Sequence, residues 1–429
     1  DASRAVGGLL PVLGGADTNK SHGITQELRA VSAPGDSPWK WLAGAFYYRN
    51  RLYDCANVGA LANLPTLPIQ IPGLLNGVLP NPCPGNVAKL GDQLTIGELK
   101  GDIELQEKAL FGELTRELGE YWEVTLGARA YWIESGGDVT TAGALYATQN
   151  NLMEVSRANS VSEHGISPKA SIVFAPTDTV RSYFTVSRGF RFGGPQIGAS
   201  IPGHDVPEVY KSDVLWNYEL GLRSDWLERS LRIDISAYHI DWKNPQVFQV
   251  ANIGNLIATN FIDNVGAARG DGVELAMRYL PRFARGLSLD VSVAWNRTVT
   301  TESFDSSTGV VVPKGSPWPL SPRWQTATTL AYAQPIRDWL LGASLRHVFM
   351  DHACNTIECT AQVFDYHTLD LNVFASGPEG SWWPQLSVTL NNLTDERGIG
   401  NVTTNPFPAG DTVTYIAPRA LVVRVSGSF

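Results

Sequence analysis

Arg419-Ala-Leu-Val-Val-Arg-Val-Ser-Gly-Ser-Phe429 is the stretch that decides the fold, and it ends on an aromatic residue. Its apolar positions recur every second residue, at Leu421, Val423, Val425 and Phe429, and they alternate with Arg424, Ser426 and Ser428. An apolar period of two predicts a β-strand with an apolar surround on one face and a polar surround on the other. An edge strand of a soluble β-sandwich would show the same pattern, so the other strands have to distinguish the two architectures.

The same alternation recurs along the chain and predicts about 15 strands. Between Trp122 and Trp132 every even-numbered residue is apolar, while Glu123 and Arg129 lie on the other face. The predicted strands cover about residues 25–32, 39–50, 104–118, 121–134, 164–175, 179–190, 213–226, 229–242, 265–279, 286–299, 323–335, 338–350, 364–376, 382–393 and 419–429.

The lengths of the connections favour one architecture. Turns of about two to six residues close each predicted hairpin, and segments of about 13 to 50 residues separate successive hairpins. Soluble sandwiches mix their connection lengths, whereas outer-membrane barrels place short turns on one rim and long loops on the other. The sequence therefore predicts an all-β fold, a transmembrane antiparallel up-and-down β-barrel.

Composition agrees with this fold class. Apolar residues make up 43% of the 429 residues, charged residues 17%, and there are 13 Trp. The mean hydropathy of −0.09 is what strands that alternate between lipid and lumen would average to. No run approaches the 18 apolar residues of a membrane-spanning helix. The net charge of −9 argues against a nucleic acid as partner.

The four cysteines fall into two pairs, and each pair lies within one connecting segment. Cys55 with Cys83 and Cys354 with Cys359 are therefore predicted to form two local disulfides in an oxidising compartment. His352, next to Cys354, offers the alternative of a zinc site, but a small disulfide loop is the better interpretation. No metal or cofactor is predicted.

Nine short motifs carry a resemblance to a known family. They are Thr-Gln-Glu-Leu-Arg at 25–29, Ala-Gly-Ala-Phe-Tyr-Tyr at 43–48, Ala-Leu-Phe-Gly-Glu at 109–113, Ser-Pro-Lys-Ala-Ser at 167–171, Ser-Arg-Gly-Phe-Arg-Phe-Gly-Gly at 187–194, Leu-Trp-Asn-Tyr-Glu-Leu-Gly at 215–221, Asp-Gly-Val-Glu-Leu at 271–275, Ser-Pro-Arg-Trp at 321–324 and Asn-Asn-Leu-Thr-Asp at 391–395. In this order, with the terminal strand, they resemble the C-terminal part of the TonB-dependent outer-membrane receptors of the siderophore receptor type. The resemblance implies a 22-stranded barrel filled by an N-terminal plug.

The chain departs from that pattern because it holds about 15 strands, without a plug or a TonB box. An up-and-down barrel closes only with an even number of strands. We therefore expect residues 1–24 to be an outer loop segment and residues 25–429 to be the C-terminal part of the barrel. The earlier strands and the plug are expected in a missing or separate piece, and contact with the TonB energy-coupling complex is expected through that piece.

Inward-facing charges offer a catalytic interpretation and a structural one. Glu123, Arg129, Arg188, Glu219, Arg223, Asp234 and Glu274 could include an acid–base pair, but hydrated charges also line large barrels. Gly189-Phe-Arg-Phe-Gly-Gly194 superficially resembles a phosphate loop, yet no helix follows it. We expect a polar lumen wall and no enzyme.

The family resemblance implies import of a scarce nutrient, most often a ferric siderophore, across the outer membrane of a Gram-negative bacterium. A general diffusion porin, an outer-membrane barrel enzyme and an importer of a non-iron organic compound are the alternatives. Candidate ligand-binding residues in the outer segments are Arg191, Phe192, Tyr210, Phe248 and Trp318, among few basic residues. Aromatic and neutral hydrogen-bonding side chains favour a bulky, weakly charged ligand, although loop aromatics can also simply pack loops together. The terminal strand contains Leu421, Val423, Val425 and Phe429. It is expected to face outer-membrane lipid and to be recognised by the barrel assembly machinery.

Overall fold

The structure, a computed structural model, describes residues 13–60, 94–142, 155–196, 206–253, 257–306, 309–378, 383–403 and 412–427. Every regular element in these residues is a β-strand. One sheet holds 15 of them: β1 (Leu13–Val31), β2 (Trp39–Ala60), β3 (Leu94–Leu118), β4 (Trp122–Ala142), β5 (Val155–Thr177), β6 (Val180–Arg191), β9 (Asp213–Trp226), β10 (Leu231–Lys243), β13 (Ala267–Tyr279), β14 (Leu287–Thr300), β17 (Trp324–Ile336), β18 (Trp339–Met350), β21 (Tyr366–Ser376), β22 (Gln385–Asn391) and β25 (Ala420–Ser426).

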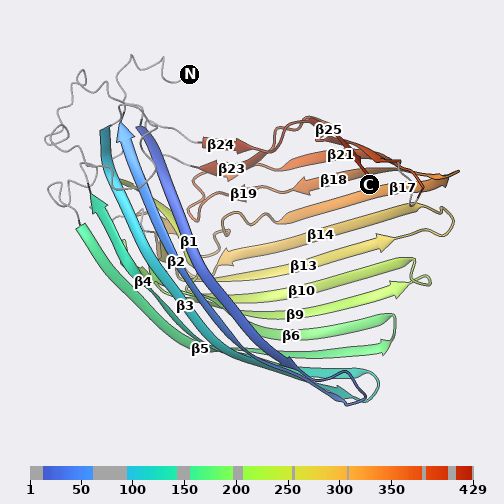
Figure 1. Cartoon of the computed structure of the whole chain (residues 1–429), viewed down its shortest axis with the longest axis horizontal. Helices are drawn as coiled ribbons and strands as arrows, with labels where there is room; N and C mark the ends of the chain where they lie inside the picture. Colours follow the sequence, from blue (N-terminus) through green and yellow to red (C-terminus); the bar gives the residue numbers. More distant parts are fainter. Residues whose placement is uncertain are drawn as a thin grey trace.

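The strands of this sheet pair in chain order, each antiparallel to the next, from β1 at one end to β25 at the other. Figure 1 shows the sheet as a curved wall, with β1 to β5 rising beyond the other strands. The prediction of an all-β, up-and-down antiparallel fold with 15 strands is confirmed. No helix in the described part of the chain is long and apolar enough to cross a membrane.

Five small hairpins lie in the connections on one rim of the sheet. They pair β7 (Gly194–Pro195) with β8 (Val209–Tyr210), β11 (Gln246–Ile253) with β12 (Ile257–Asn264), β15 (Phe304–Asp305) with β16 (Val311–Val312), β19 (Ala353–Cys354) with β20 (Gln362–Val363), and β23 (Ile399–Thr403) with β24 (Thr412–Tyr415). In the described residues the opposite rim has only short turns between strands. Long connections therefore gather on one side, as a membrane barrel requires.

The pairing register keeps the two faces of the sheet distinct across strands. Leu386, Val388 and Leu390 lie opposite Val425, Val423 and Leu421 on one face. On this face large apolar side chains remain exposed: Val423 is 59% exposed and Leu126 is 59% exposed. Apolar side chains that a sheet leaves outward in a continuous band fit a lipid surround rather than water.

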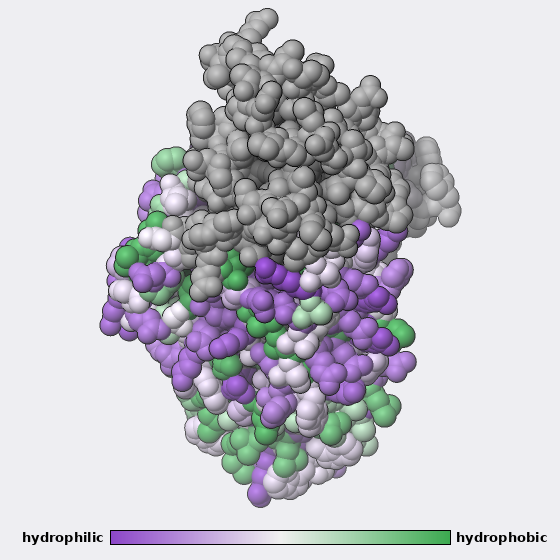
Figure 2. Space-filling model, turned by 90° about the vertical axis from the view of Figure 1, so that its left-hand side faces the viewer, coloured by the Kyte–Doolittle hydropathy of each residue, from purple (hydrophilic) through white to green (hydrophobic). Residues whose placement is uncertain are grey.

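Strands β1 to β5 are longer than the sequence predicted. β1 begins at Leu13, not near Thr25, so residues 13–24 are strand rather than loop, and they pair with β2 along its whole length. Residues 51–60 and 94–103, expected in a long loop, likewise extend β2 and β3. Figure 2 looks onto the side where these strands end; hydrophilic residues predominate on its described part, and hydrophobic residues become more frequent toward its lower end.

A repeated packing arrangement fixes the inward face. The Tyr183 ring lies over Gly221 of the neighbouring strand, and the Tyr238 ring lies over Gly272; a Cβ atom at either glycine would overlap the ring. These are close approaches that only glycine allows. Phe111 covers Gly44 and Phe374 covers Gly342 in the same way. Glycine inside these strands thus makes room for aromatic rings that lie flat across the ladder.

Candidate functional site

The inward face of the sheet is a wall of cross-strand ion pairs. Four of them join neighbouring or nearby strands: Arg129 with Glu107 at 2.5 Å, Lys169 with Glu113 at 3.0 Å, Arg181 with Glu123 at 3.3 Å and Arg278 with Asp290 at 2.7 Å. Partly exposed pairs of this kind contribute little stability each. Their main consequence is a hydrated, charged inner surface.

A hollow of about 920 Å³ lies on this inward face, over β6, β9, β10, β13, β14, β17 and β18. Its lining includes Tyr183, Glu219, Arg223, Asp234 and Glu274. The Tyr183 hydroxyl donates a hydrogen bond of 2.6 Å to Glu219, and the Arg223 guanidinium stands 5.6 Å from the centre of the Tyr183 ring. The hollow can accept a polar molecule or a polar protein segment of complementary shape.

Six of the seven charged residues expected on the inward face belong to it by register. Arg188 is the exception in register, but its side chain interacts with Tyr131 on the inward face. Arg188 pairs with Trp216, on the face that carries the outward apolar residues. Its guanidinium donates a hydrogen bond to the backbone carbonyl of Ile166, beyond the point where the β5–β6 ladder ends at Lys169 and Ser187. Pro168 interrupts that ladder because it has no N–H to donate, so the Arg188 side chain satisfies a backbone group there.

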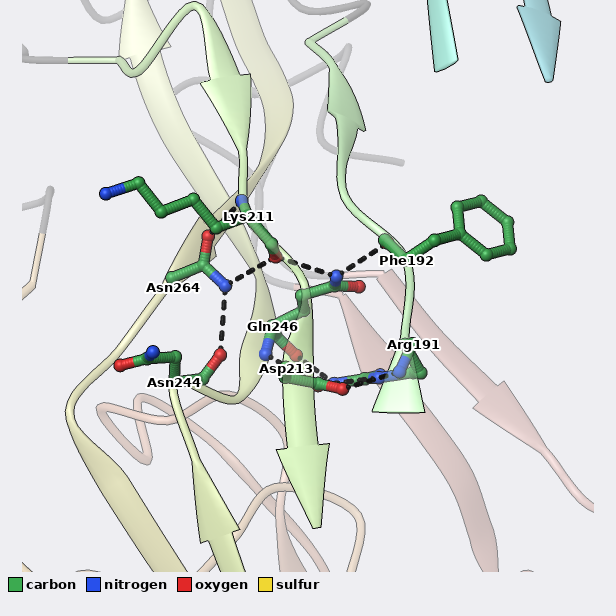
Figure 3. Close-up of polar contacts among 7 residues, drawn as sticks. All are labelled: Arg191, Phe192, Lys211, Asp213, Asn244, Gln246 and Asn264. Carbon is green, nitrogen blue, oxygen red and sulfur yellow. Dashed lines mark hydrogen bonds and ion pairs between the residues drawn. The ribbon is translucent and has the colours of Figure 1, made fainter. Parts of the chain in front are cut away.

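A polar network ties the loop-side ends of four strands together, and Figure 3 shows it. Asp213 is 1% exposed and accepts hydrogen bonds from the Arg191 Nε at 2.8 Å and the Gln246 backbone N–H at 3.2 Å. A buried carboxylate is costly unless it is paired and hydrogen-bonded, and here both requirements are met. Arg191 also lies 5.0 Å from the centre of the Trp242 ring. The Arg191 guanidinium is thus paired with Asp213, while half of its side chain remains exposed.

Amide side chains complete this network. The Gln246 side-chain amide donates to the carbonyls of Phe192 at 2.9 Å and Lys211 at 3.0 Å. The Asn264 side chain donates to the Lys211 and Asn244 carbonyls, both at 2.9 Å. The Lys211 side chain itself points away from the network (Figure 3). The backbone polar groups of the β6–β9 and β10–β13 connections are satisfied together, which fixes these two connections relative to each other.

The five candidate ligand residues do not form one cluster. Arg191 is paired with Asp213, and Trp318 packs against Trp242 with ring centres 4.8 Å apart. Tyr210 lies against Gly194, and burial raises the pKa of its hydroxyl. Only Phe192 and Phe248 have exposed rings, at 39% and 61%. Their role in ligand binding stays a prediction.

The outer loops share a small apolar core of their own. Val247, Val265, Val312 and Ile357 are buried together, and Phe304 and Trp318 pack against them. Ile357 comes from the loop closed by the Cys354–Cys359 disulfide, whose prediction is confirmed. Cys55 is buried and disulfide-bonded, while Cys83, its predicted partner, lies outside the described residues, as does Phe429.

A second apolar cluster on the inward face was not predicted. Ala109, Tyr131 and Ile133 are buried there, with Phe46 and Phe190 packed against them, and Tyr131 stacks on Phe190 with ring centres 3.8 Å apart. The period-two pattern marks this face as polar, so apolar residues in it were not expected. A usable signal is Gly165, which the register places opposite Tyr131 and whose missing side chain makes room for that ring.

The fold is shared with solved uptake receptors and a transporter. The ferric yersiniabactin uptake receptor FyuA from Yersinia pestis superposes with a TM-score of 0.73 at 17% identity, over 97% of this chain and 55% of that chain. The copper transporter OprC gives 0.67 at 16% identity, over 97% and 58%. The siderophore receptor PiuA from Acinetobacter baumannii gives 0.66 at 14% identity, over 96% and 56%. The chain spans about half the length of these proteins.

No curated protein sequence matches the chain. Residues 13–393 match the family described as TonB dependent receptor-like, beta-barrel. This match covers most of the 15-stranded sheet, from the first residue of β1 to just past β22. The chain therefore belongs to the TonB-dependent receptor β-barrel family, whose members are transport receptors.

Proposed function

We propose that this chain forms the larger part of the barrel wall of an outer-membrane receptor in a Gram-negative bacterium, and that the receptor imports a ferric siderophore. The observation that carries the proposal is that the two faces of the sheet differ in polarity. An outward apolar band suits lipid, while the inward face bears ion pairs and a polar hollow. A transport path through the membrane needs this combination. The siderophore assignment draws on FyuA, a ferric yersiniabactin uptake receptor, and on PiuA, a siderophore receptor.

The proposal includes partners outside the chain. An odd number of strands in antiparallel order leaves β1 and β25 running in the same direction, so further strands complete the wall. A plug segment would cover the inward ion pairs and gate passage, and the TonB complex would act on that segment. The terminal strand faces lipid and is recognised by the barrel assembly machinery. In this proposal the wall performs transport and no bond chemistry.

Within the siderophore class, a weakly charged chelate fits better than a strongly anionic one. An anionic ligand that loses water on binding needs cations that are free to pair with it. The Arg191 guanidinium is already paired with the buried Asp213. The exposed rings of Phe192 and Phe248 offer stacking surface instead. The same rings make an importer of a non-iron organic compound the second candidate.

The test is growth under iron limitation with the complete gene deleted and then restored. We expect the deletion strain to lose uptake of at least one ferric chelate, and the restored gene to return it. A Phe192→Ala, Phe248→Ala double variant should need severalfold more chelate for the same growth, because each lost ring removes about 1 kcal/mol of stacking. Phe283→Ala is the matched control, since Phe283 is 85% exposed in a turn on the opposite rim.

Unimpaired uptake of every chelate, together with lost growth on a particular carbon source, would replace iron by that organic compound. Passage of many unrelated small solutes, independent of energy from the inner membrane, would instead indicate a diffusion porin. Either result removes the siderophore assignment. The family membership would stand in both cases, because it rests on the sequence match.

A further inference from the structure

Two histidines lie against each other on the outward face, close to the loop-side end of β18. His347 belongs to β18 and His367 to β21, and these strands are antiparallel neighbours. The register places His347 opposite Leu369 and His367 opposite Phe349. The two imidazoles therefore occupy diagonal positions on one face, within reach of each other. A sequence pattern cannot show this, because a loop of the outer rim separates the two residues.

The two rings are in direct contact. The Nε2 atom of His347 and the Nδ1 atom of His367 are 3.1 Å apart, and the rings are stacked at 26° with centres 5.3 Å apart. Phe349 packs against His367 with ring centres 4.7 Å apart. In a neutral pair one of the facing nitrogens donates its proton and the other accepts it. A single proton thus lies between the two facing nitrogen atoms.

The spacing of the nitrogens suits a metal ion in place of that proton. Imidazole nitrogens bind Zn²⁺ at about 2.0–2.1 Å. Two such bonds that meet at about 90–110° would hold their nitrogens about 2.9–3.4 Å apart. The observed separation of 3.1 Å lies within this range. We propose that His347 and His367 form a two-nitrogen surface site for a divalent transition-metal ion.

The donor set decides which metals the site accepts. Imidazole suits Cu²⁺, Ni²⁺ and Zn²⁺, whereas Ca²⁺ and Mg²⁺ require oxygen ligands. Among the divalent ions Cu²⁺ binds a given nitrogen site most tightly. Within the described residues no group of three or more His, Cys, Asp or Glu could hold a metal, so water completes the coordination. His367 is exposed and is the second residue of β21, at the loop-side rim, and His347 is half-buried. This position places the nitrogens at the level of the headgroups and water rather than in the middle of the apolar band.

The site is separate from the transport path. His347 follows Leu345 on the outward face by two residues, while Arg346 and Asp370 pair in register on the inward face. A metal bound by the two histidines is therefore held outside the barrel wall. The proposal does not depend on which nutrient passes through the lumen.

The test is a Cu²⁺ titration of the complete purified receptor in detergent, followed by electron paramagnetic resonance. The wild-type protein should bind one ion with hyperfine coupling to two imidazole nitrogens. His347→Gln and His367→Gln should each weaken binding at least tenfold and leave coupling to one nitrogen, because loss of a ligand costs no less than loss of an outer-shell partner, about 10–100-fold. Zn²⁺ should compete, and Ca²⁺ should not.

His352→Gln is the matched control. His352 lies near the same rim and bonds to Asp351 rather than to a second histidine, so its substitution should leave the two-nitrogen signal unchanged. Heat-dependent electrophoretic mobility checks that each variant is a folded barrel. If His367→Gln does not fold, His367→Asn takes its place. Equal Cu²⁺ affinity in wild type and both single variants would overturn the proposal. A two-nitrogen signal that only the His352 substitution abolishes would overturn it as well.

Discussion

Single residues on the two faces of the sheet meet different surroundings, and the difference decides which substitutions the protein tolerates. Val423 lies opposite Val388 on the outward face, whereas Arg424 lies opposite Ser387 on the inward face. Glycines on the inward face provide space rather than turn geometry, as Gly221 does under the Tyr183 ring. Charge and volume are therefore the two properties that matter at this scale.

Val423→Arg should prevent stable insertion into the outer membrane. A charged side chain on the lipid face costs about 2–4 kcal/mol near the middle of the bilayer. Ser426→Arg, in the same strand and on the inward face, should have little effect. The measurement is the amount of folded, heat-modifiable protein in outer-membrane fractions. Equal amounts for the two variants would show that the faces are assigned wrongly.

Gly221→Ala should destabilise the barrel by about 1–3 kcal/mol, the usual cost of forcing extra atoms into a packed site. The new methyl group would displace the Tyr183 ring and break its hydrogen bond to Glu219. Gly189→Ala is the control in the paired strand β6, because its Cβ would meet Leu215 at an ordinary distance of 3.4 Å. Unfolding in urea within detergent or lipid measures both variants. A control as unstable as Gly221→Ala would contradict this explanation.

At the scale of elements, the sequence predicted the membrane-spanning parts of the strands and missed their extensions beyond the membrane. The period of two persists where one face meets lipid and the other meets water, so the 15 strands and most of their turn-side ends were predicted correctly. It disappears where both faces meet water, as in the Arg49–Glu104 region of β2 and β3. The loop network could not be predicted for a different reason. Arg191 and Asp213, at the two ends of the β6–β9 connection, meet Gln246 of the β10–β13 connection, and a local sequence pattern does not show contacts between distant segments.

The loop-side extension of β2 and β3 should depend on pH. The Arg51 guanidinium lowers the pKa of Asp102, and the Arg49 guanidinium lowers the pKa of Glu104, in each case first through a direct hydrogen bond. A carboxyl whose folded pKa is lowered adds stability above its unfolded pKa, about 3.9 for Asp and 4.3 for Glu, and that stability is lost as the pH falls through the folded value.

Amide hydrogen exchange in residues 99–107 should therefore quicken, after correction for intrinsic rates, when the pH falls from 6 to below about 4. An Asp102→Asn, Glu104→Gln double variant should already exchange fast at pH 6 and change little on acidification. Protection that is the same at both pH values in the wild type would remove the role assigned to these ion pairs.

The disulfide loop should hold the outer apolar core together. Closure of so short a loop stabilises a fold by about 2 kcal/mol through the unfolded chain, and Ile357 within it is 2% exposed among residues of other loops. Cys354→Ser with Cys359→Ser should make the outer loops more sensitive to protease, while the barrel stays folded. Thiol labelling of the unreduced, unfolded wild type should give no signal. Unchanged proteolysis of the double variant would show that the apolar contacts suffice alone.

At the scale of the whole molecule, the two rims differ in construction, and this difference predicts orientation. One rim carries the small hairpins and the long connections, and the other, as far as the structure describes it, carries only short turns. Long connections lie outside the cell in outer-membrane barrels. The fold therefore predicts that the rim with the long connections lies outside the cell and that the other rim lies in the periplasm. A labelling experiment can test this orientation.

Gly309→Cys should react with a membrane-impermeant maleimide on intact cells, and Gly119→Cys should react only after the outer membrane is permeabilised. The two sites are well matched: both glycines have positive φ angles, 80° and 69°, and neither has an atom within 4 Å of an added Cβ. The native cysteines give no background, since none is free in the described structure. Labelling of Gly119→Cys alone on intact cells would reverse the orientation.

The unequal strand lengths give the receptor an uneven profile above the membrane. β3 has 25 residues and β18 has 12, which at about 3.3 Å per residue and a tilt of about 45° correspond to heights of about 58 Å and 28 Å. The apolar band needs only about 25 Å. One flank therefore rises about 30 Å over the cell surface, while the other ends near the lipid headgroups. In the proposed receptor, a ligand that approaches from outside would therefore meet strands that extend far beyond the membrane on the β1 to β5 side and strands that end close to it on the β18 side.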